Sequence, residues 1–335
     1  MVGRSRARQV FDLVAGFTYS QVLAAAVELG MLDHLAGEPQ DISALSARTG
    51  LSEPAASRLI RAMVALELAE EVAPGRWMLG RHGAVVQADR GVQAMIRHHR
   101  LLFADLVDPV ALLTADRRED TALSRFWTYA RGGNPTHRSS SAYSELMAES
   151  QAMVAREVLA AYDFSRHRAV LDVGGGHGVF LKTLATRHPQ LQLGLFDLPA
   201  VAQDCVASSE RGQTAEGCAV HAGDFFCDPL PSGYDCITLL RILHDHDDED
   251  ALRLLRAVCA ALPAGGRLLI AEPMAQTPGA EAMAAYFEFY LWTMGSGRPR
   301  APGEIGTLLA RAGFHRWTLR RSNQPIISSV VVAYK

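Results

Sequence analysis

The sequence predicts an α/β protein: a parallel, Rossmann-like sheet in the C-terminal half, preceded by a helical, winged-helix-like domain. Strand-length apolar runs alternate with helix-length segments from residue 169 onward, which is typical of a parallel sheet. The first run ends in a glycine cluster, Asp172-Val-Gly-Gly-Gly-His-Gly178. Three amphipathic helical patterns before residue 70 are followed by a hairpin pattern, which indicates the winged-helix-like part. With 335 residues the chain is long enough for both domains.

The composition is that of an ordinary globular protein, with 49% hydrophobic and 21% charged residues. A net charge of −3 offers no general attraction to nucleic acid. The five cysteines form no C-x-x-C pair, so we expect reduced thiols and a cytoplasmic protein. We find no signal peptide and no apolar run of membrane-spanning length, and therefore expect no transmembrane segment. Peripheral contact with a membrane stays open.

The first domain begins with an apolar helical pattern over residues 10–35, in which Gly30 is expected to stop the helix. A short helix follows over residues 41–50, and Ser52 is expected to cap a third helix. Pro74-Gly75 is expected to form the turn of a two-stranded wing. The pattern therefore predicts three helices and a wing.

A winged helix raises the hypothesis of a DNA-binding regulator, whose third helix would enter the major groove. The third helix holds Arg58 and Arg61, but Glu53 and Glu67 lie on or beside it, so no basic stripe forms. The apolar helices before residue 70 are too many for one small domain to bury. We therefore expect a homodimer without nucleic acid, and keep the DNA-binding regulator as the alternative of a different class.

Residues 84–165 are predicted to be mostly helical and to connect the two domains. We expect a winged-helix-like domain over residues 1–100, a helical connector over 101–150 and the α/β domain over 151–335. The connector is rich in aromatic residues and methionine. Most of these residues are expected to form helix core, and a few to line an apolar pocket.

The glycine cluster predicts a buried strand, a tight turn and the start of a helix. The missing side chains at Gly174 and Gly176 allow a ligand to lie against the backbone. The dinucleotide fingerprint requires a small residue at position 179, which is Val179 here. The carboxylate of Asp172 suits a cationic amino-acid group better than a pyrophosphate. S-adenosylmethionine is therefore favoured over NAD, and a glycine turn without a ligand is the alternative.

The later strands predict further ligand contacts. A second strand over residues 191–196 ends at Asp197, at the distance from Gly174 expected of an acid that binds ribose hydroxyls. A third strand over residues 217–221 is followed by Asp224 and Phe225, which could hold an adenine by its amino group and its face. Further strands are expected over residues 235–240 and 267–272. Residues 316–334 are expected to supply the closing strands, of which 326–333 is the clearer one.

Residues 241–250, Arg241-Ile-Leu-His-Asp-His-Asp-Asp-Glu-Asp250, follow the fourth strand. Asp247 or Asp248 is expected to cap the next helix. His244, Asp245 and His246 suggest a metal site as an alternative. However, neighbouring residues rarely converge on one ion, so we expect no metal. His244 lies just past the carboxyl end of a central strand, where a base could act on a bound substrate.

These motifs, in this order and spacing, resemble the plant-type (caffeate-like) S-adenosylmethionine-dependent O-methyltransferases over nearly the whole chain. The resemblance implies a methyltransferase domain, a front domain that dimerises, and S-adenosylmethionine as donor, with S-adenosylhomocysteine as product and no metal. It implies donor contacts at Asp172, Gly174, Gly176, Asp197, Leu198, Asp224, Phe225 and Arg241. It also implies that His244 is the base, that Glu272 orients it and that Asp245 lies beside the reacting oxygen.

Three positions depart from the family pattern. His246 stands where the family usually has Trp, and Leu240 stands where it often has Lys, with Arg241 displaced by one position. The second acid that holds the base in the plant enzymes aligns with Pro299. His244 is therefore expected to have one carboxylate partner, Glu272.

A narrower resemblance is to the hydroxycarotenoid O-methyltransferases of photosynthetic bacteria. It is carried by residues 98–99, 105–113, 126–129, 143–151 and 294–300. It implies that the acceptor is the terminal tertiary hydroxyl of an acyclic, demethylspheroidene-like carotenoid. Phenolic or polyketide O-methylation and C-methylation of a bacteriochlorophyll precursor remain alternatives. An apolar acceptor tunnel ending at His244 would be lined by Phe126, Trp127, Tyr143, Met147, Tyr286 and Tyr290.

Overall fold

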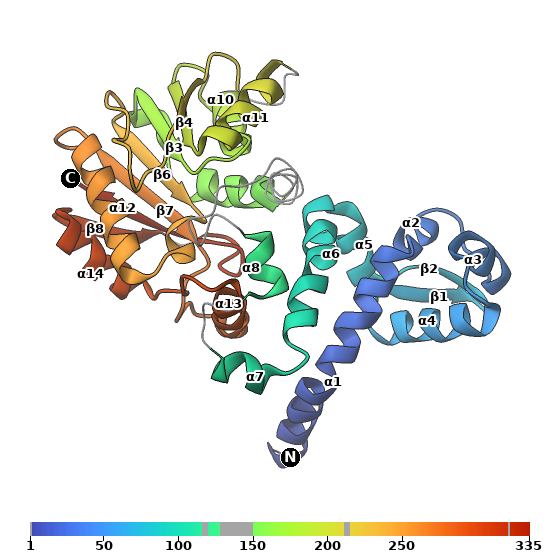
Figure 1. Cartoon of the computed structure of the whole chain (residues 1–335). Helices are drawn as coiled ribbons and strands as arrows, with labels where there is room; N and C mark the ends of the chain where they lie inside the picture. The colour runs from blue at the N-terminus through green and yellow to red at the C-terminus, as the bar shows by residue number, and fades with distance from the viewer. Residues whose placement is uncertain (1, 116–119, 128–149, 211–214, 321) are drawn as a thin grey trace. The chain divides into compact units, whose positions relative to one another are not determined.

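A computed structural model describes the whole chain except residues 1, 116–119, 128–149, 211–214 and 321 (Figure 1). The chain divides into two compact units, Met1–Arg100 and Leu101–Lys335. We describe each unit by itself.

The first unit contains the predicted three helices and wing. Gly30, in the left-handed region with φ 63°, ends the first helix, and residues 31–35 form a separate short helix. As expected, Ser52 caps α4 by accepting a hydrogen bond from the Ala55 backbone N–H. The helices are α1 (Val2–Glu28), α2 (Met31–Leu35), α3 (Ile42–Thr49), α4 (Glu53–Ala65), α5 (Arg81–Ala88) and α6 (Arg90–Asp105), and the wing consists of β1 (Ala69–Ala73) and β2 (Arg76–Leu79).

The core of the first unit lies between α1, α2, α3 and α4. Helix α4 buries Ala56, Ile60 and Met63 in it. Residues 10–17 of α1, in contrast, expose five large apolar side chains: Val10, Phe11, Leu13, Val14 and Phe17. The stretch Arg6–Glu28 is also long and apolar enough to cross a membrane, by length and composition only. This differs from the expectation that no apolar run reaches that length.

The second unit is built on a seven-stranded sheet of order β5-β4-β3-β6-β7-β9-β8. Its strands are β3 (Ala169–Val173), β4 (Gln192–Asp197), β5 (Ala219–Ala222), β6 (Cys236–Leu240), β7 (Arg267–Glu272), β8 (Arg316–Arg320) and β9 (Ser329–Tyr334). The first five are parallel and β9 is antiparallel to both of its neighbours. The third predicted strand begins two residues late, because Gly217 adopts a positive φ of 72°.

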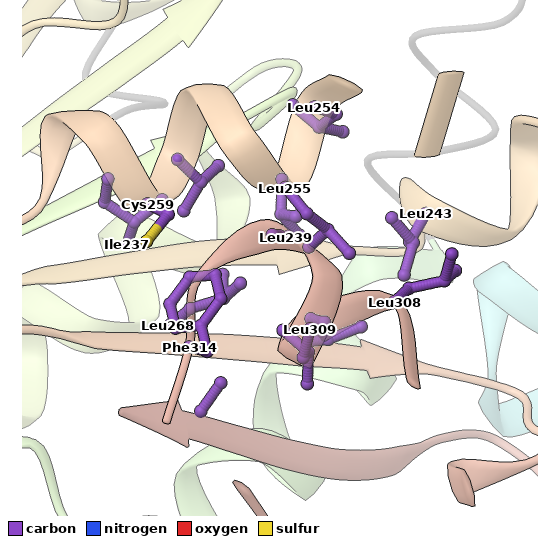
Figure 2. Packing of buried hydrophobic residues seen from close by; sticks show 14 of the residues in the cluster. Ile237, Leu239, Leu243, Leu254, Leu255, Cys259, Leu268, Leu308, Leu309 and Phe314 are labelled. Carbon is purple, nitrogen blue, oxygen red and sulfur yellow. The ribbon is translucent and has the colours of Figure 1, made fainter. Parts of the chain in front are cut away.

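Helices cover both faces of this sheet. Helices α12 (Asp248–Ala261) and α14 (Pro302–Ala312) pack on one face, where Ile237 and Leu239 of β6 point (Figure 2). The alternate residues of β6, Cys236 and Leu240, belong to the core on the other face, with α10 (Val179–Arg187). Further helices of this unit are α7 (Pro109–Thr114), α8 (Ala122–Phe126), α11 (Pro199–Glu210) and α13 (Glu281–Met294), and residues 150–161, before β3, are helical as well.

The order in which successive strands are added to the sheet reverses at β3: β4 and β5 lie on one side of it, and β6 and β7 on the other. Strand β3 pairs in parallel with β4 on one side and with β6 on the other. Ligands of open α/β sheets bind beyond the carboxyl ends of the strands at such a switch point. The candidate site residues follow these strand ends.

Candidate active site

The glycine turn after β3 has the backbone that its glycines predict. Gly174, Gly176 and Gly178 all have positive φ, at 73°, 57° and 72°. A side chain at Gly174 would collide with Ile242 of the loop after β6. A side chain at Gly176 would meet no atom within 4 Å. The turn therefore packs tightly on one side and leaves the backbone at Gly176 accessible to a ligand.

Asp172 is a fully buried acid beside this turn. One carboxylate oxygen accepts a hydrogen bond from the Thr238 hydroxyl at 2.5 Å. Among the described residues the other oxygen, Oδ2, has no hydrogen-bond partner. Burial raises the pKa of Asp172 to about 7. A buried carboxylate oxygen without a partner is a natural site for a cationic group.

Asp197, at the end of β4, is bound to the same glycine turn. Its Oδ2 accepts a hydrogen bond from the Gly176 N–H and its Oδ1 one from the Leu198 N–H, both at 2.8 Å. Burial raises the pKa of Asp197 to about 6, and the two hydrogen bonds oppose that rise. The carboxylate is thus held firmly next to the Gly176 backbone.

Asp224 and Phe225 lie in the turn after β5. Asp224 Oδ1 accepts a hydrogen bond from the Phe226 N–H at 2.8 Å. The Phe225 ring meets the His246 ring edge-to-face at 5.5 Å between centroids, and Phe226 meets it at 5.1 Å. His246, one of the departures from the family pattern, therefore joins the turn after β5 to the turn after β6.

His244 lies in the short 3-10 helix η3 (Leu243–Asp245), directly beyond β6. Its Nε2 is 3.3 Å from Asp245 Oδ1, and its ring lies 5.7 Å from that of Phe287. Among the residues described, Nδ1 has no hydrogen-bond partner. Burial, and then the cations Arg241 and Arg300, lower the pKa of His244 to about 3. The imidazole is therefore neutral at neutral pH and can accept a proton.

Glu272, at the end of β7, contacts His244 through the backbone. Its Oε2 accepts a hydrogen bond from the His244 N–H at 3.0 Å. Its Oε1 has no partner in the part of the chain that is described. Burial raises the pKa of Glu272 to about 8, and the charge of Arg300 opposes that rise. Glu272 thus holds the turn that carries His244 through its backbone N–H, and its role in orienting the base stays a prediction.

Arg241 occupies a strained position between β6 and η3. It is a non-glycine residue with a positive φ of 61°, a conformation that concentrates at functional sites. Its guanidinium donates to the Ser150 hydroxyl at 2.8 Å. Its charge lowers the pKa of His244. The contribution of Arg241 to a donor site stays a prediction.

Of the six residues expected at the acceptor site, the structure describes four, Phe126, Trp127, Tyr286 and Tyr290. Phe126 and Trp127 lie at the end of α8, and the Trp127 indole N–H donates to the Tyr290 hydroxyl of α13 at 3.0 Å. Tyr286 lies 5.6 Å from Tyr290, ring to ring. Tyr143 and Met147 lie outside the described residues. This aromatic cluster reaches His244 through Phe287.

Two residues near His244 were not anticipated from the sequence. The sequence pattern does not distinguish Phe287 from the other aromatic residues of α13, although Phe287 lies one helical turn from Tyr290. Arg300, which is fully buried, donates hydrogen bonds to the backbone on both sides of His244. In the sequence, Arg300 stands out only as the last residue of the stretch 294–300, one of those that carry the narrower resemblance. In the described part of the chain, no group of three or more His, Cys, Asp or Glu residues could hold a metal ion.

Two family models match this chain. The family model for an O-methyltransferase domain matches residues 103–315, and that for an O-methyltransferase dimerisation domain matches residues 11–82.

Two curated relatives match over the full length of the chain. The demethylspheroidene O-methyltransferase of Cereibacter sphaeroides is 40% identical over 338 residues, covering 100% of this chain and 88% of the relative. The enzyme of the same description from Rhodobacter capsulatus is 42% identical over 335 residues, covering 99% and 83%.

A solved structure shares the fold. Human N-acetylserotonin methyltransferase in complex with SAM superposes with a TM-score of 0.83 at 24% identity, covering 98% of this chain and 97% of that one.

Proposed function

Because the chain belongs to the O-methyltransferase family, we propose that it transfers the methyl group of S-adenosylmethionine to the hydroxyl of an acyclic, demethylspheroidene-like carotenoid. The observation that carries the choice of acceptor is the 40% and 42% identity to two demethylspheroidene O-methyltransferases over the whole chain. Two relatives whose names give a ring hydroxyl as the acceptor are less similar: the 3-amino-4-hydroxybenzoate 4-O-methyltransferase of Streptomyces cremeus is 30% identical, and the 3-hydroxy-5-methyl-1-naphthoate 3-O-methyltransferase of Streptomyces sahachiroi is 32% identical over 78% of this chain.

The residues at the strand ends fit S-adenosylmethionine. The Asp172 oxygen that has no partner among the described residues suits the α-ammonium group of the methionine end. The backbone at Gly176, where an added side chain would meet no atom within 4 Å, leaves room beside it. Asp197 keeps lone pairs for ribose hydroxyls while it accepts two backbone N–H groups. Leu198, Asp224 and Phe225 complete the proposed nucleoside contacts, and no metal is required.

S-adenosylmethionine supplies a methyl group bound to a sulfonium sulfur. The positive charge on sulfur makes the methyl carbon electrophilic enough to react with a neutral hydroxyl oxygen. The pKa of a tertiary alcohol is at least that of water, about 15.7, so His244 cannot deprotonate it beforehand. The pKa of the alcohol lies about 9 units above that of an ordinary histidine, so full proton transfer to histidine would cost roughly 12 kcal/mol. The lowered pKa of His244, about 3, widens that gap. His244 therefore orients the hydroxyl by accepting its hydrogen bond.

The proton moves late in this mechanism. The hydroxyl oxygen forms a bond to the methyl carbon as the carbon–sulfur bond breaks, and the sulfur keeps the electron pair. The oxygen then carries three bonds and a positive charge, which makes its proton strongly acidic. His244 accepts that proton, and Asp245, 3.3 Å from Nε2, stabilises the resulting imidazolium.

The acceptor is proposed to lie against the aromatic cluster of α8 and α13. The residues proposed to contact it are Phe126, Trp127, Tyr286 and Tyr290, with Tyr143 and Met147 beyond the described part. Rings without charge suit a polyene chain that needs no polar partner along its length.

Binding of S-adenosylhomocysteine tests the donor site. Isothermal titration calorimetry should give about one site per chain, and chelation should leave the affinity unchanged. Asp197→Ala should weaken binding by a factor of ten or more, because two buried ribose hydroxyls lose a charged acceptor. Unchanged affinity in that variant would remove Asp197 from the donor site. Transfer of a labelled methyl group to the carotenoid tests the acceptor and is described at the end of the Discussion.

A further inference from the structure

Arg300 is a fully buried cation whose guanidinium is bound to the turn that carries His244. Its Nη1 donates to the Leu243 carbonyl at 2.8 Å and its Nη2 to the His246 carbonyl at 2.7 Å. Nε and Nη2 both donate to Asp248 Oδ1, at 2.9 and 2.8 Å. Every nitrogen of this side chain therefore contacts the segment from Leu243 to Asp248.

The neighbours of Arg300 bind the two carbonyls in between. The Arg298 N–H donates to the His244 carbonyl at 2.9 Å, and the Ser296 hydroxyl donates to the Asp245 carbonyl at 2.8 Å. Thus each of the four consecutive carbonyls from residue 243 to 246 accepts a hydrogen bond from residues 296–300. From the opposite direction, Glu272 accepts the His244 N–H.

The close approach of these two segments depends on Gly297. Its φ is 76°, and a side chain there would collide with the His244 carbonyl oxygen. Burying a guanidinium costs several kcal/mol unless its donors are satisfied, and an apolar side chain of similar volume would fill the space at lower cost. A cation that makes four hydrogen bonds to the segment from Leu243 to Asp248 is therefore better explained by what it positions than by packing.

We propose that Arg300 is a positioning residue for methyl transfer, which fixes the turn so that the His244 ring meets the acceptor hydroxyl. The proposal rests on the proposed role of His244 as the base. Arg300 contacts neither of the proposed donor acids, Asp172 and Asp197, in its hydrogen bonds. Its removal should therefore affect the chemical step more than the binding of the donor.

Arg300 also contributes to the charge around His244. Besides burial, the charged or titratable groups that act on His244 are Arg241, Arg300 and His246, which lower its pKa, Asp245, whose Oδ1 lies 3.3 Å from Nε2, and Glu272, which accepts its backbone N–H. The two arginines lower the pKa of His244. Loss of the charge of Arg300 should therefore raise that pKa and move the acid limb of the kcat–pH profile to higher pH.

The test compares Arg300→Met with wild type and with Arg298→Met. The Arg298 side chain is a matched control, because it also binds Asp248 but is 38% exposed, and Arg298→Met leaves in place the backbone N–H that binds the His244 carbonyl. We expect Arg300→Met to lower kcat about 100-fold and to shift the acid limb upward, with the affinity for S-adenosylhomocysteine within threefold of wild type. Arg298→Met should keep kcat within threefold. Added guanidinium should restore part of the kcat of Arg300→Ala.

Two outcomes would overturn the proposal. One is a folded Arg300→Met with the kcat and pH profile of wild type, and the other is a loss of activity matched by the same loss of donor binding. If Arg300→Met does not fold, Ser296→Ala takes its place, since it removes one hydrogen bond of the same set. It should lower kcat about threefold to tenfold at unchanged donor affinity, and an unchanged kcat contradicts the proposal. Each kcat of a variant is compared with that of the wild type on the acceptor that the wild type methylates. The carotenoid assignment is tested with the wild type alone, so its failure is distinguished from failure of the proposal for Arg300.

Discussion

Glu272 accepts the backbone N–H of His244 at 3.0 Å, and it does so with one carboxylate oxygen while the other has no partner in the described part of the chain. Because burial raises the pKa of Glu272 to about 8, the side chain is largely protonated at pH 7. It therefore acts as a neutral hydrogen-bond acceptor for the turn.

This relationship predicts the behaviour of two substitutions at Glu272. Glu272→Gln keeps an amide oxygen for the His244 N–H and should retain kcat within about fivefold. Glu272→Ala leaves a buried N–H unpaired, which costs about 1–3 kcal/mol, and should lower both kcat and the melting temperature. Steady-state kinetics and thermal unfolding of both variants check this. A 100-fold loss in Glu272→Gln would show instead that the carboxylate acts on the ring.

The buried carboxylate of Asp172 is expected to lower the stability of the protein above pH 7 and to be needed for donor binding. Its pKa of about 7 lies above the usual 3.8, so its folded form binds the proton more tightly. Its contribution to stability is therefore present below pH 4 and lost as the pH rises through 7. Asp172→Asn should raise the free energy of unfolding at pH 8 by about 1–3 kcal/mol, after the cost of a new buried amide N–H, and have less effect at pH 5.

Donor affinity should change in the opposite sense. The ammonium group needs the ionised carboxylate, so the wild type should bind S-adenosylhomocysteine more tightly as the pH rises from 5.5 to about 7. Asp172→Asn should bind weakly at both pH values. Calorimetric titration at pH 5.5 and 8 checks this, and equal affinity of variant and wild type at pH 8 would remove Asp172 from the donor site.

The proposed contact of Trp127, which is hydrogen-bonded to Tyr290 in the aromatic cluster, with the acceptor predicts that KM depends on acceptor length. Trp127→Ala should raise the KM for a long hydroxycarotenoid by more than that for a short hydroxylated analogue, because each buried CH₂ contributes about 0.8 kcal/mol. Phe289→Ala on the same helix is the control, since Phe289 is 38% exposed and should change neither KM. An equal rise in KM for both acceptors contradicts an extended apolar site.

The exposed apolar side chains of α1 predict the oligomeric state. The wild type should be a dimer at micromolar concentration by light scattering, since the dimerisation domain matches from residue 11. Phe17→Glu should shift it toward monomer, because Phe17 is 73% exposed in the single chain. Leu319→Glu, at an exposed position of β8, is the control. A monomeric wild type, or a fully dimeric Phe17→Glu, contradicts this use of α1.

Much of the fold was predictable because its signals are local. Gly30, Ser52 and Pro74-Gly75 act within a few residues, and alternating strands and helices imply a parallel sheet. The strand-end residues Asp172 and Asp197 then share one edge, because the carboxyl ends of parallel strands do. The contact between Asp197 and the Gly176 N–H follows from that topology.

The remaining features depend on tertiary contacts that leave no local pattern. Arg300 is 57 residues from the Leu243 carbonyl to which it donates, and an arginine in a polar stretch gives no sign of complete burial. Whether Glu272 meets the ring or the backbone of His244 depends on the turn of η3. Phe287 and Phe289 are both phenylalanines of α13, and they differ in the face of the helix on which they lie: Phe287 lies beside His244, whereas Phe289 is exposed.

The central claim is that methyl transfer to a carotenoid hydroxyl uses His244. The most direct measurement supplies the purified enzyme with isotopically labelled S-adenosylmethionine and an equimolar mixture of a demethylspheroidene-like carotenoid, a catechol and a bacteriochlorophyll precursor, and reads the products by mass spectrometry. We predict a labelled ether on the tertiary hydroxyl of the carotenoid. His244→Ala should lower this product at least 100-fold with unchanged S-adenosylhomocysteine affinity. Label mainly on the catechol, or on carbon, or undiminished turnover by His244→Ala would contradict the account.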